Sequence, residues 1–230
     1  GRRKKTIILL LILVIIPSGI LLLRGAKHTF TTLPYLGYKE VNGPGDTTYW
    51  SVPGFTFTDQ NGRTVTQKDF EGKILVVDFF FTRCATICPK MTAHMQQIQL
   101  ELTDPDKAGT YAEVALVSHT VDPVHDTPEI LRAYARQHEA DTTRWHFLTG
   151  DASAIYRQGN TGYLLNASLP DSLSDQFLHD EHFALVDKRR HIRGFYDGTS
   201  ENDMGRLMTD LKMLLAEERR RAREAREAKQ

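Results

Sequence analysis

The chain has 230 residues, of which 40% are hydrophobic and 25% are charged, with 16 glycines and 9 prolines. This composition excludes a collagen-like or low-complexity polymer and a wholly disordered chain. The length suits one globular domain with additional segments. Lysine plus arginine and aspartate plus glutamate both number 29, so the formal net charge is zero.

The zero net charge is the sum of unlike segments. Residues 1–27 contain six basic residues and no acidic one, which leaves residues 28–230 with 23 basic and 29 acidic residues. Residues 217–230 hold six basic and four acidic residues, so residues 28–216 carry a net charge of −8. An acidic domain is poorly suited to binding nucleic acid, and its field modestly favours cations.

The N-terminal segment has the pattern of a membrane anchor. Ile7 to Leu23 is a mostly apolar run that would extend roughly 25 Å as a helix. The basic residues 2–5 precede it and favour a cytoplasmic N-terminus with the rest of the chain exported. A cleaved signal peptide is the alternative, but no small-x-small cleavage site follows the run. We therefore expect one transmembrane helix within an anchor over 1–27, and we interpret residues 28–50 as a tether.

A hairpin and a buried strand are the first elements expected in the exported part. β-Forming residues alternate at 55–58 and 63–66 around Asn61-Gly62, which is a strong hairpin signal. Residues 74–81 form a nearly continuous apolar run, as expected of a strand that is buried on both faces. Apolar residues at helical spacing then predict a helix from about 89 to 102, with Pro89 in its first turn.

Strands and helices alternate in the rest of the domain. The expected elements, in chain order, are a strand at 113–117, a helix from about 126 to 138, a strand at 145–148, a short helix at 152–157, a hairpin of 182–186 with 191–196, and a helix that follows the capping pattern at 200–203. This order predicts an α/β domain over residues 51–216, with a mixed sheet and helices on both faces. Residues 217–230 lack an apolar stripe and have Glu/Arg pairs at helical spacing, so we expect a solvated, charged helical tail.

The only two cysteines, Cys84 and Cys88, lie where the buried strand ends and the first helix begins. Sites of α/β proteins are commonly at this place. The spacing lets both sulfurs face one side of a helical turn, and the helix N-terminus favours the thiolate, which is nucleophilic and binds metals. A structural disulfide is the alternative, but so small a loop gains little chain entropy from it.

Two thiolates do not complete a stable metal site. Soft thiolates suit copper(I), zinc or an iron–sulfur cluster, and an added imidazole would also accommodate copper(II). Zinc or a cluster would ordinarily need four protein ligands, and the chain has no further cysteines. Several histidines are candidates for a further ligand, and spacing alone does not choose among them: His94, His119, His125, His179 and His182.

Four motifs, in order, resemble those of the Sco/SenC copper-chaperone family, over roughly residues 50–215. The stretch from Phe79 to Met91 resembles the family's FxFTxCPxxCPxM core, and Val121 to Glu129 matches its VDPxxDTPE segment. The other counterparts are Trp145 to Gly150, and His179 to Asp187 with Ile192 to Gly198.

The resemblance implies a thioredoxin-like fold in which Cys84, Cys88 and a distant histidine bind one copper ion, as Cu(I) or Cu(II). The family's histidine lies six residues before the Leu/Val pair of the following strand, which corresponds to His179. His182 is out of that register and is kept as a reserve ligand. Ala85 stands where the family usually has proline, which puts redox tuning in doubt more than copper binding.

The resemblance also implies a role and a location. Members of the family help to assemble the copper A centre of cytochrome c oxidase, as metal donor, thiol reductant or both. The expected partners are the copper A subunit or another copper or thiol protein, and the membrane through the N-terminal helix, with no nucleic acid. Together with the anchor, this places the globular domain on the periplasmic side of a bacterial inner membrane.

Three other functions compete with this one. A thiol–disulfide oxidoreductase with incidental metal affinity would need the cysteines but not His179. A thiol peroxidase is suggested by Cys88-Pro89, but Phe81 and Ala85 occupy the positions where that chemistry usually has proline and threonine. A membrane-tethered binding module would act through the charged tail.

Three aspartates near these motifs have open roles. Asp78 is either an acid or base beside the cysteines or a buried, hydrogen-bonded residue of its strand. Asp122 and Asp126 are interpreted as turn and cap residues, and the sequence also allows them a part in shaping the site.

Overall fold

Strand β5 (Ile74–Phe80) lies in the interior of a mixed sheet, and all of its residues are buried.

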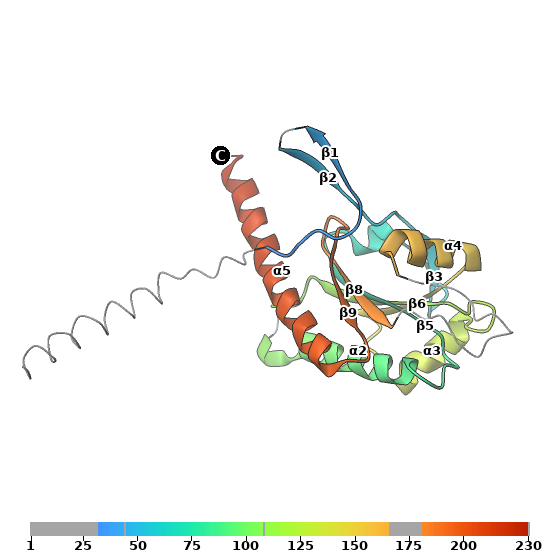
Figure 1. Ribbon diagram of the computed structural model, residues 1–230. Helices are drawn as coiled ribbons and strands as arrows, with labels where there is room; N and C mark the ends of the chain where they lie inside the picture. The colour runs from blue at the N-terminus through green and yellow to red at the C-terminus, as the bar shows by residue number, and fades with distance from the viewer. Residues whose placement is uncertain (1–31, 44, 108, 166–180, 230) are drawn as a thin grey trace, which may run out of the picture. The chain divides into compact units, whose positions relative to one another are not determined.

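The computed structural model describes residues 32–43, 45–107, 109–165 and 181–229 (Figure 1). The expected anchor over 1–27 and the candidate ligand His179 lie outside the described residues. Among the helices that are described, none is both long and apolar enough to cross a membrane.

The sheet has seven strands in the order β4-β3-β7-β6-β5-β8-β9. Strands β5, β6 (Val114–Thr120) and β7 (Trp145–Thr149) are parallel, and the flanking strands pair antiparallel. The flanking strands are β3 (Thr56–Asp59), β4 (Thr64–Thr66), β8 (His182–Val186) and β9 (Ile192–Asp197). Every residue of β5 and β6 is buried, which fits the nearly continuous apolar run of β5 and the apolar first half of β6.

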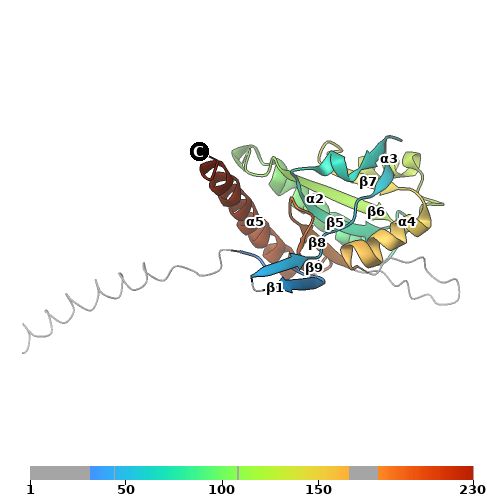
Figure 2. The same cartoon turned by 90° about the horizontal axis from the view of Figure 1, so that it is seen from above.

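Helices cover both faces of the sheet, as Figures 1 and 2 show. One face carries α2 (Cys88–Thr103), α3 (Pro128–Gln137) and α5 (Glu201–Glu227), and the other carries the short α4 (Ala152–Arg157). Because α2 and α3 each connect neighbouring parallel strands in the same direction across the sheet, right-handed crossovers put them on the same face. The described chain also has three short helical segments: η1 (Gln67–Phe70), η2 (Pro105–Lys107) and η3 (Gln158–Tyr163).

The predicted elements are present, with differences at some of their ends. The hairpin around Gly62 is confirmed, with Phe57 opposite Val65 and a positive φ of 78° at the glycine. Strand β6 extends beyond the predicted 113–117 and includes His119. Its last residues are polar and would signal a loop, but pairing with β5 on one side and β7 on the other buries them.

Part of the predicted tether belongs to the folded domain, so this interpretation is corrected for residues from 33 onward. Leu33 is buried, and Leu36 N donates to Ile192 O at 2.9 Å along the outer edge of β9. This contact covers part of an edge strand that would otherwise expose its hydrogen-bonding groups. The chain then forms a separate two-stranded hairpin of β1 (Lys39–Gly43) and β2 (Asp46–Tyr49).

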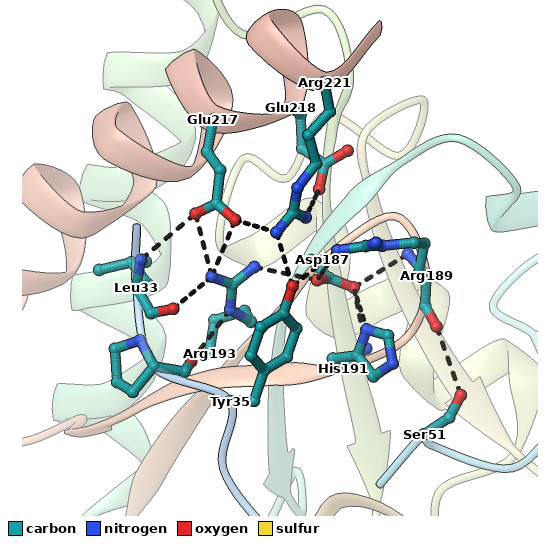
Figure 3. A network of polar contacts seen from close by, with 11 residues as sticks. Leu33, Tyr35, Ser51, Asp187, Arg189, His191, Arg193, Glu217, Glu218 and Arg221 are labelled. Carbon is teal, nitrogen blue, oxygen red and sulfur yellow. Dashed lines mark hydrogen bonds and ion pairs between the residues drawn. The ribbon is translucent and has the colours of Figure 1, made fainter. Parts of the chain in front are cut away.

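A buried ion-pair network joins this N-terminal segment to α5 (Figure 3). The fully buried side chain of Arg193 lies between two carboxylates, with Nη1 3.1 Å from Asp187 Oδ2 and Nη2 3.0 Å from Glu217 Oε2. Arg193 Nε also donates to Pro34 O at 3.0 Å, and Glu217 Oε2 accepts from Leu33 N at 3.2 Å. The fixed fork of guanidinium donors allows one arginine to hold a strand, a helix and a loop together.

The solvated tail therefore begins later in α5 than the predicted residue 217. Glu217 and Glu218 are only 2% and 8% exposed, and Arg221 pairs with both. The sequence around Glu217 and Glu218 is typical of a solvent-exposed helix. The local pattern does not reveal their burial, because the arginine that pairs with Glu217 is in β9. Residues 222–229 are exposed, as expected of a charged tail.

Replacing Glu217 by alanine should lower the free energy of unfolding by about 3–5 kcal/mol, because Arg193 would keep a buried charge with one carboxylate fewer. Glu224→Ala is the matched control on the same helix, since the side chain of Glu224 is 60% exposed and makes only a 3.8 Å pair with Arg220. We expect this control to change stability by less than about 0.5 kcal/mol. Chemical denaturation measures both values, and equal losses would contradict a structural role for the buried pair.

Candidate metal centre

The two cysteines flank the loop between β5 and α2. After β5 the chain turns so that Cys84 N donates to Phe81 O at 3.2 Å, and α2 begins at Cys88. Pro89 lies in the first turn of α2, where its missing N–H group removes no helical hydrogen bond. The predicted strand-to-helix loop is therefore confirmed, with the helix starting one residue earlier than expected.

The two thiols have different surroundings. Both are free, and Cys88 N donates to Cys84 Sγ at 3.4 Å. Thr86 Oγ1 lies 3.5 Å from the same sulfur. Cys84 is 8% exposed and Cys88 only 1%, so a reagent in solvent reaches Cys84 first.

These surroundings separate the pKa values of the two thiols. Burial raises the pKa of Cys84, but hydrogen bonds with Thr86 and Cys88 outweigh burial and leave this pKa below its usual range. Burial raises the pKa of Cys88, and the neighbouring Cys84 and Asp78 raise it further. The lowered pKa of Cys84 agrees with the expected preference for the thiolate, whereas at Cys88 desolvation opposes the effect of the helix N-terminus.

The carboxylate of Asp126 holds the start of the cysteine loop. Its buried oxygens accept from Thr82 N at 3.0 Å, from Thr82 Oγ1 at 2.5 Å and from Thr120 Oγ1 at 2.5 Å. His125 Nδ1 lies 2.8 Å from Asp126 Oδ1. One buried group thereby joins the ends of β5 and β6 at the edge of the sheet where parallel strands end.

A second carboxylate holds the next residue of the loop. Arg83 donates from Nε to Asp122 Oδ2 at 2.8 Å, and its Nη2 is 2.7 Å from the same oxygen. Asp122 is also the turn residue that was expected, since its carbonyl accepts from Asp126 N at 2.8 Å. The interpretation of Asp126 as a helix cap is corrected: Thr127 is the N-cap of α3, and the Asp126 side chain binds the cysteine loop instead.

The candidate histidines have different environments. His94 on α2 is buried, with Nδ1 2.7 Å from Gly198 O, and it serves the packing of the domain. His119 is fully buried and stacks on Phe79 at 5.0 Å, and burial lowers its pKa to about 3. His125 is 40% exposed and lies beside the cysteine loop.

The start of β8 lies at the same edge of the sheet as the cysteine loop. Strand β8 runs antiparallel to β5, with Val77 opposite Ala184, so its first residues are beside the end of β5. Glu181 O accepts from Gly198 N at 2.6 Å, and Gly198 O in turn contacts His94 of α2. The described chain therefore resumes after residue 180 close to the helix that begins with a cysteine.

Across the described ranges, no three His, Cys, Asp or Glu side chains are arranged to hold a metal ion. The structure brings Cys84 and Cys88 together as two sulfur donors. The role of His179, which lies outside the described residues, stays a prediction, as does that of the reserve His182 at the start of β8.

Comparison with known proteins decides the family. The family model described as SCO1/SenC matches residues 46–216. The chain belongs to the SCO1/SenC family. The SCO1 protein homolog of Bacillus subtilis (strain 168) is 31% identical over 164 residues, which cover 71% of this chain and 82% of that protein.

Solved Sco structures share the fold described above. BsSco, a member of the Sco family of cytochrome c oxidase assembly proteins in which a disulfide switch was identified, is 30% identical with a TM-score of 0.63, over 72% of this chain and 94% of that one. Bradyrhizobium japonicum ScoI with copper bound is 24% identical with a TM-score of 0.55, over 70% of this chain and 99% of that one. The expected mixed α/β, thioredoxin-like fold is thus confirmed for this Sco chain.

Asp78 is a buried residue in the interior of β5 of this Sco protein. Its side chain is 2% exposed, and Oδ1 has no hydrogen-bond partner among the described residues. Burial, only partly offset by Ser118, raises the pKa of Asp78 to about 7. Of the two interpretations of this residue, the structure supports the buried one, although its carboxyl group is incompletely hydrogen-bonded.

The raised pKa of Asp78 predicts a pH-dependent cost in stability. The folded protein holds this proton up to about pH 7, whereas the unfolded chain releases it near 3.8, so stability falls as pH rises between these values. The difference in unfolding free energy between Asp78→Asn and wild type should therefore grow in favour of the variant from pH 4 to 7, by up to about 4 kcal/mol. Denaturation of both proteins across this range measures it, and parallel curves would contradict the assignment.

Replacing Asp126 by asparagine should loosen the cysteine loop, because the amide turns an N–H group toward hydroxyl and N–H donors that need an acceptor. We expect a loss of about 1–3 kcal/mol in unfolding free energy and faster hydrogen exchange at the Thr82 amide. Asp151→Asn is the matched control, since Asp151 caps α4 by accepting from Ala154 N and asparagine caps equally well. A Thr82 amide that stays protected in Asp126→Asn would count against this role.

Proposed function

We propose that this Sco protein is a membrane-anchored copper-binding protein that delivers copper to the copper A site during cytochrome c oxidase assembly, or reduces the cysteines of that site. The free Cys84–Cys88 pair at the start of α2 is the observation that carries the proposal. The family supports it, because BsSco belongs to a family of cytochrome c oxidase assembly proteins and B. japonicum ScoI was solved with copper bound.

The proposed copper donors are Cys84 Sγ, Cys88 Sγ and the imidazole of His179. Two thiolates and an imidazole are a donor set that suits copper(I) and leaves an open position for copper(II). His179 is two residues before Glu181, so their Cα atoms are at most about 7 Å apart. Glu181 O accepts from Gly198 N, and Gly198 O contacts His94 of α2, so the described chain resumes near that helix, which supports the choice of a histidine from the adjoining segment.

The difference between the two thiols gives copper binding an order. Cys84 has the lowered pKa and the larger exposure, so it is the first of the two sulfurs to bind the ion. Cys88 follows when the charge of the bound ion favours loss of its proton. Release to a partner would proceed by ligand exchange, beginning at the more exposed sulfur.

The same difference favours a second candidate function, thiol–disulfide exchange. The Cys84 thiolate would attack a disulfide of the partner, form a mixed disulfide and release one partner thiolate. Deprotonated Cys88 would then attack the Cys84 sulfur, release the second partner thiolate and close a Cys84–Cys88 disulfide. Two electrons pass to the partner in total, and bound copper would block the reaction because it occupies the same sulfurs.

The proposal includes an exported location for the domain. Basic residues 2–5 before the apolar run from Ile7 to Leu23 support an anchor in a bacterial inner membrane with a cytoplasmic N-terminus. The copper-binding domain would then face the periplasm, where its copper A partner is accessible.

Titration of the reduced protein with copper(II) tests the proposal. We expect about one copper ion per chain, with thiolate-to-copper absorption that is lost in Cys84→Ser and in Cys88→Ser. His179→Ala should weaken copper(II) binding by about 100-fold or more, because it removes a ligand. His182→Ala, three residues away, is the matched control and should leave the affinity nearly unchanged.

The remaining outcomes separate the alternatives. Reduction of a model disulfide should survive in His179→Ala, since that reaction uses only the sulfurs. A wild-type copper stoichiometry near zero, together with rapid disulfide reduction, would support the oxidoreductase instead. Unchanged copper affinity in His179→Ala would refute this ligand assignment, and a loss confined to His182→Ala would move it to the reserve ligand.

A further inference from the structure

A histidine outside the proposed ligand set lies beside the cysteine loop. His125 is in the segment between β6 and α3, with Nδ1 2.8 Å from Asp126 Oδ1 and 3.5 Å from Thr82 Oγ1. Thr82 shares one turn with Cys84, because Cys84 N donates to Phe81 O at 3.2 Å. The ring therefore lies against the turn that carries Cys84.

The contact with Asp126 determines which nitrogen of the ring is open. This carboxylate already accepts from Thr82 N, Thr82 Oγ1 and Thr120 Oγ1, so it acts as an acceptor and His125 Nδ1 carries the proton. Nε2 keeps its lone pair and has no hydrogen-bond partner within the part of the chain that the structure describes. Metal-binding histidines commonly have this arrangement, with one nitrogen held by a carboxylate and the other directed to the metal.

Exposure falls from this ring toward the sulfurs. The side chain of His125 is 40% exposed, whereas Cys84 is 8% exposed and Cys88 1%. Arg83, a cation on the same loop, is paired with Asp122 at 2.7 Å, which offsets its repulsion of an incoming metal ion. The imidazole of His125 is therefore more accessible to an ion in solvent than either sulfur.

We propose that His125 is a receiving ligand for copper, whose Nε2 binds the incoming ion and passes it to Cys84. The proposal rests on the copper-binding function proposed above. In the transfer, the bond from copper to Cys84 Sγ forms as the bond to Nε2 breaks, any thiol proton goes to solvent, and copper keeps its oxidation state. His125 is separate from the final ligand set, since it forms no three-ligand group with the cysteines in the described chain.

Rapid mixing of the reduced full-length protein with copper(II), followed by thiolate-to-copper absorption, tests this role. His125→Asn is the main variant, because its amide can still donate to Asp126 but has no imidazole lone pair, and His125→Ala removes both properties. We expect copper loading to slow by about tenfold or more in both variants, as the local concentration of copper near Cys84 falls. The amount of copper bound at equilibrium should stay that of wild type.

A second measurement does not need the thiols. In the Cys84→Ser/Cys88→Ser protein, substoichiometric paramagnetic copper(II) should broaden the proton NMR signals of the His125 ring before those of His138. His138 is the control because it is at the other end of α3, as the C-cap of that helix.

Each outcome of these experiments decides the inference. A His125→Asn protein that loads copper as fast as wild type overturns it, and so does the absence of selective broadening at His125. If wild type loads with cysteine-dependent absorption in that case, only the receiving role fails and the proposed function stands. A wild-type protein that takes up no copper overturns both.

Discussion

The buried carboxylate of Asp126 is the interaction on which the geometry of the cysteine loop depends. It gathers the amide and hydroxyl of Thr82 and the hydroxyl of Thr120, three donors from the ends of two central strands. Each buried donor left without an acceptor would cost about 1–3 kcal/mol, so the loop has little freedom to move away. The cysteine loop is therefore held at its beginning by this carboxylate and at its end by the first turn of α2.

This rigid support explains how two cysteines four residues apart come to differ. Cys84 stays in the loop, where hydrogen bonds lower its pKa and a small part of its surface is exposed. Cys88 is the first residue of α2 and packs into the domain, where burial raises its pKa. We infer one more reactive and one buried thiol, an arrangement that would serve both of the proposed activities, stepwise copper binding and thiol–disulfide exchange.

Much of the fold was predictable because its signals are local. The apolar run of β5, the Asn-Gly hairpin and the proline at the start of α2 each depend on neighbouring residues only. The burial of Glu217 was not predictable, because its partner Arg193 is 24 residues away in a strand. A helix sequence rich in arginine and glutamate otherwise indicates that the helix is exposed to solvent. The same holds for residues 33–36, whose position on β9 depends on that buried arginine.

The candidate site divides in the same way. Sequence identifies the two cysteines by their place between strand and helix, but it treats them as equivalent, because desolvation depends on what the helix packs against. The sequence also predicts that Asp126 is a helix cap. The hydrogen bond that its carboxylate accepts from Thr82 in another loop has no signature in the residues around Asp126. The proposed role of His125 depends on its contact with that carboxylate, which the sequence does not reveal. The prediction that His179 is a copper ligand rests on the family resemblance.

X-ray absorption at the copper edge of the copper-loaded protein tests most directly whether the cysteine loop is a copper site. Two sulfur neighbours per copper, with scattering from at least one imidazole, are the result expected of a Cys84–Cys88–histidine site. A copper ion surrounded only by nitrogen and oxygen would contradict it, because the ion would then be bound away from the two thiols.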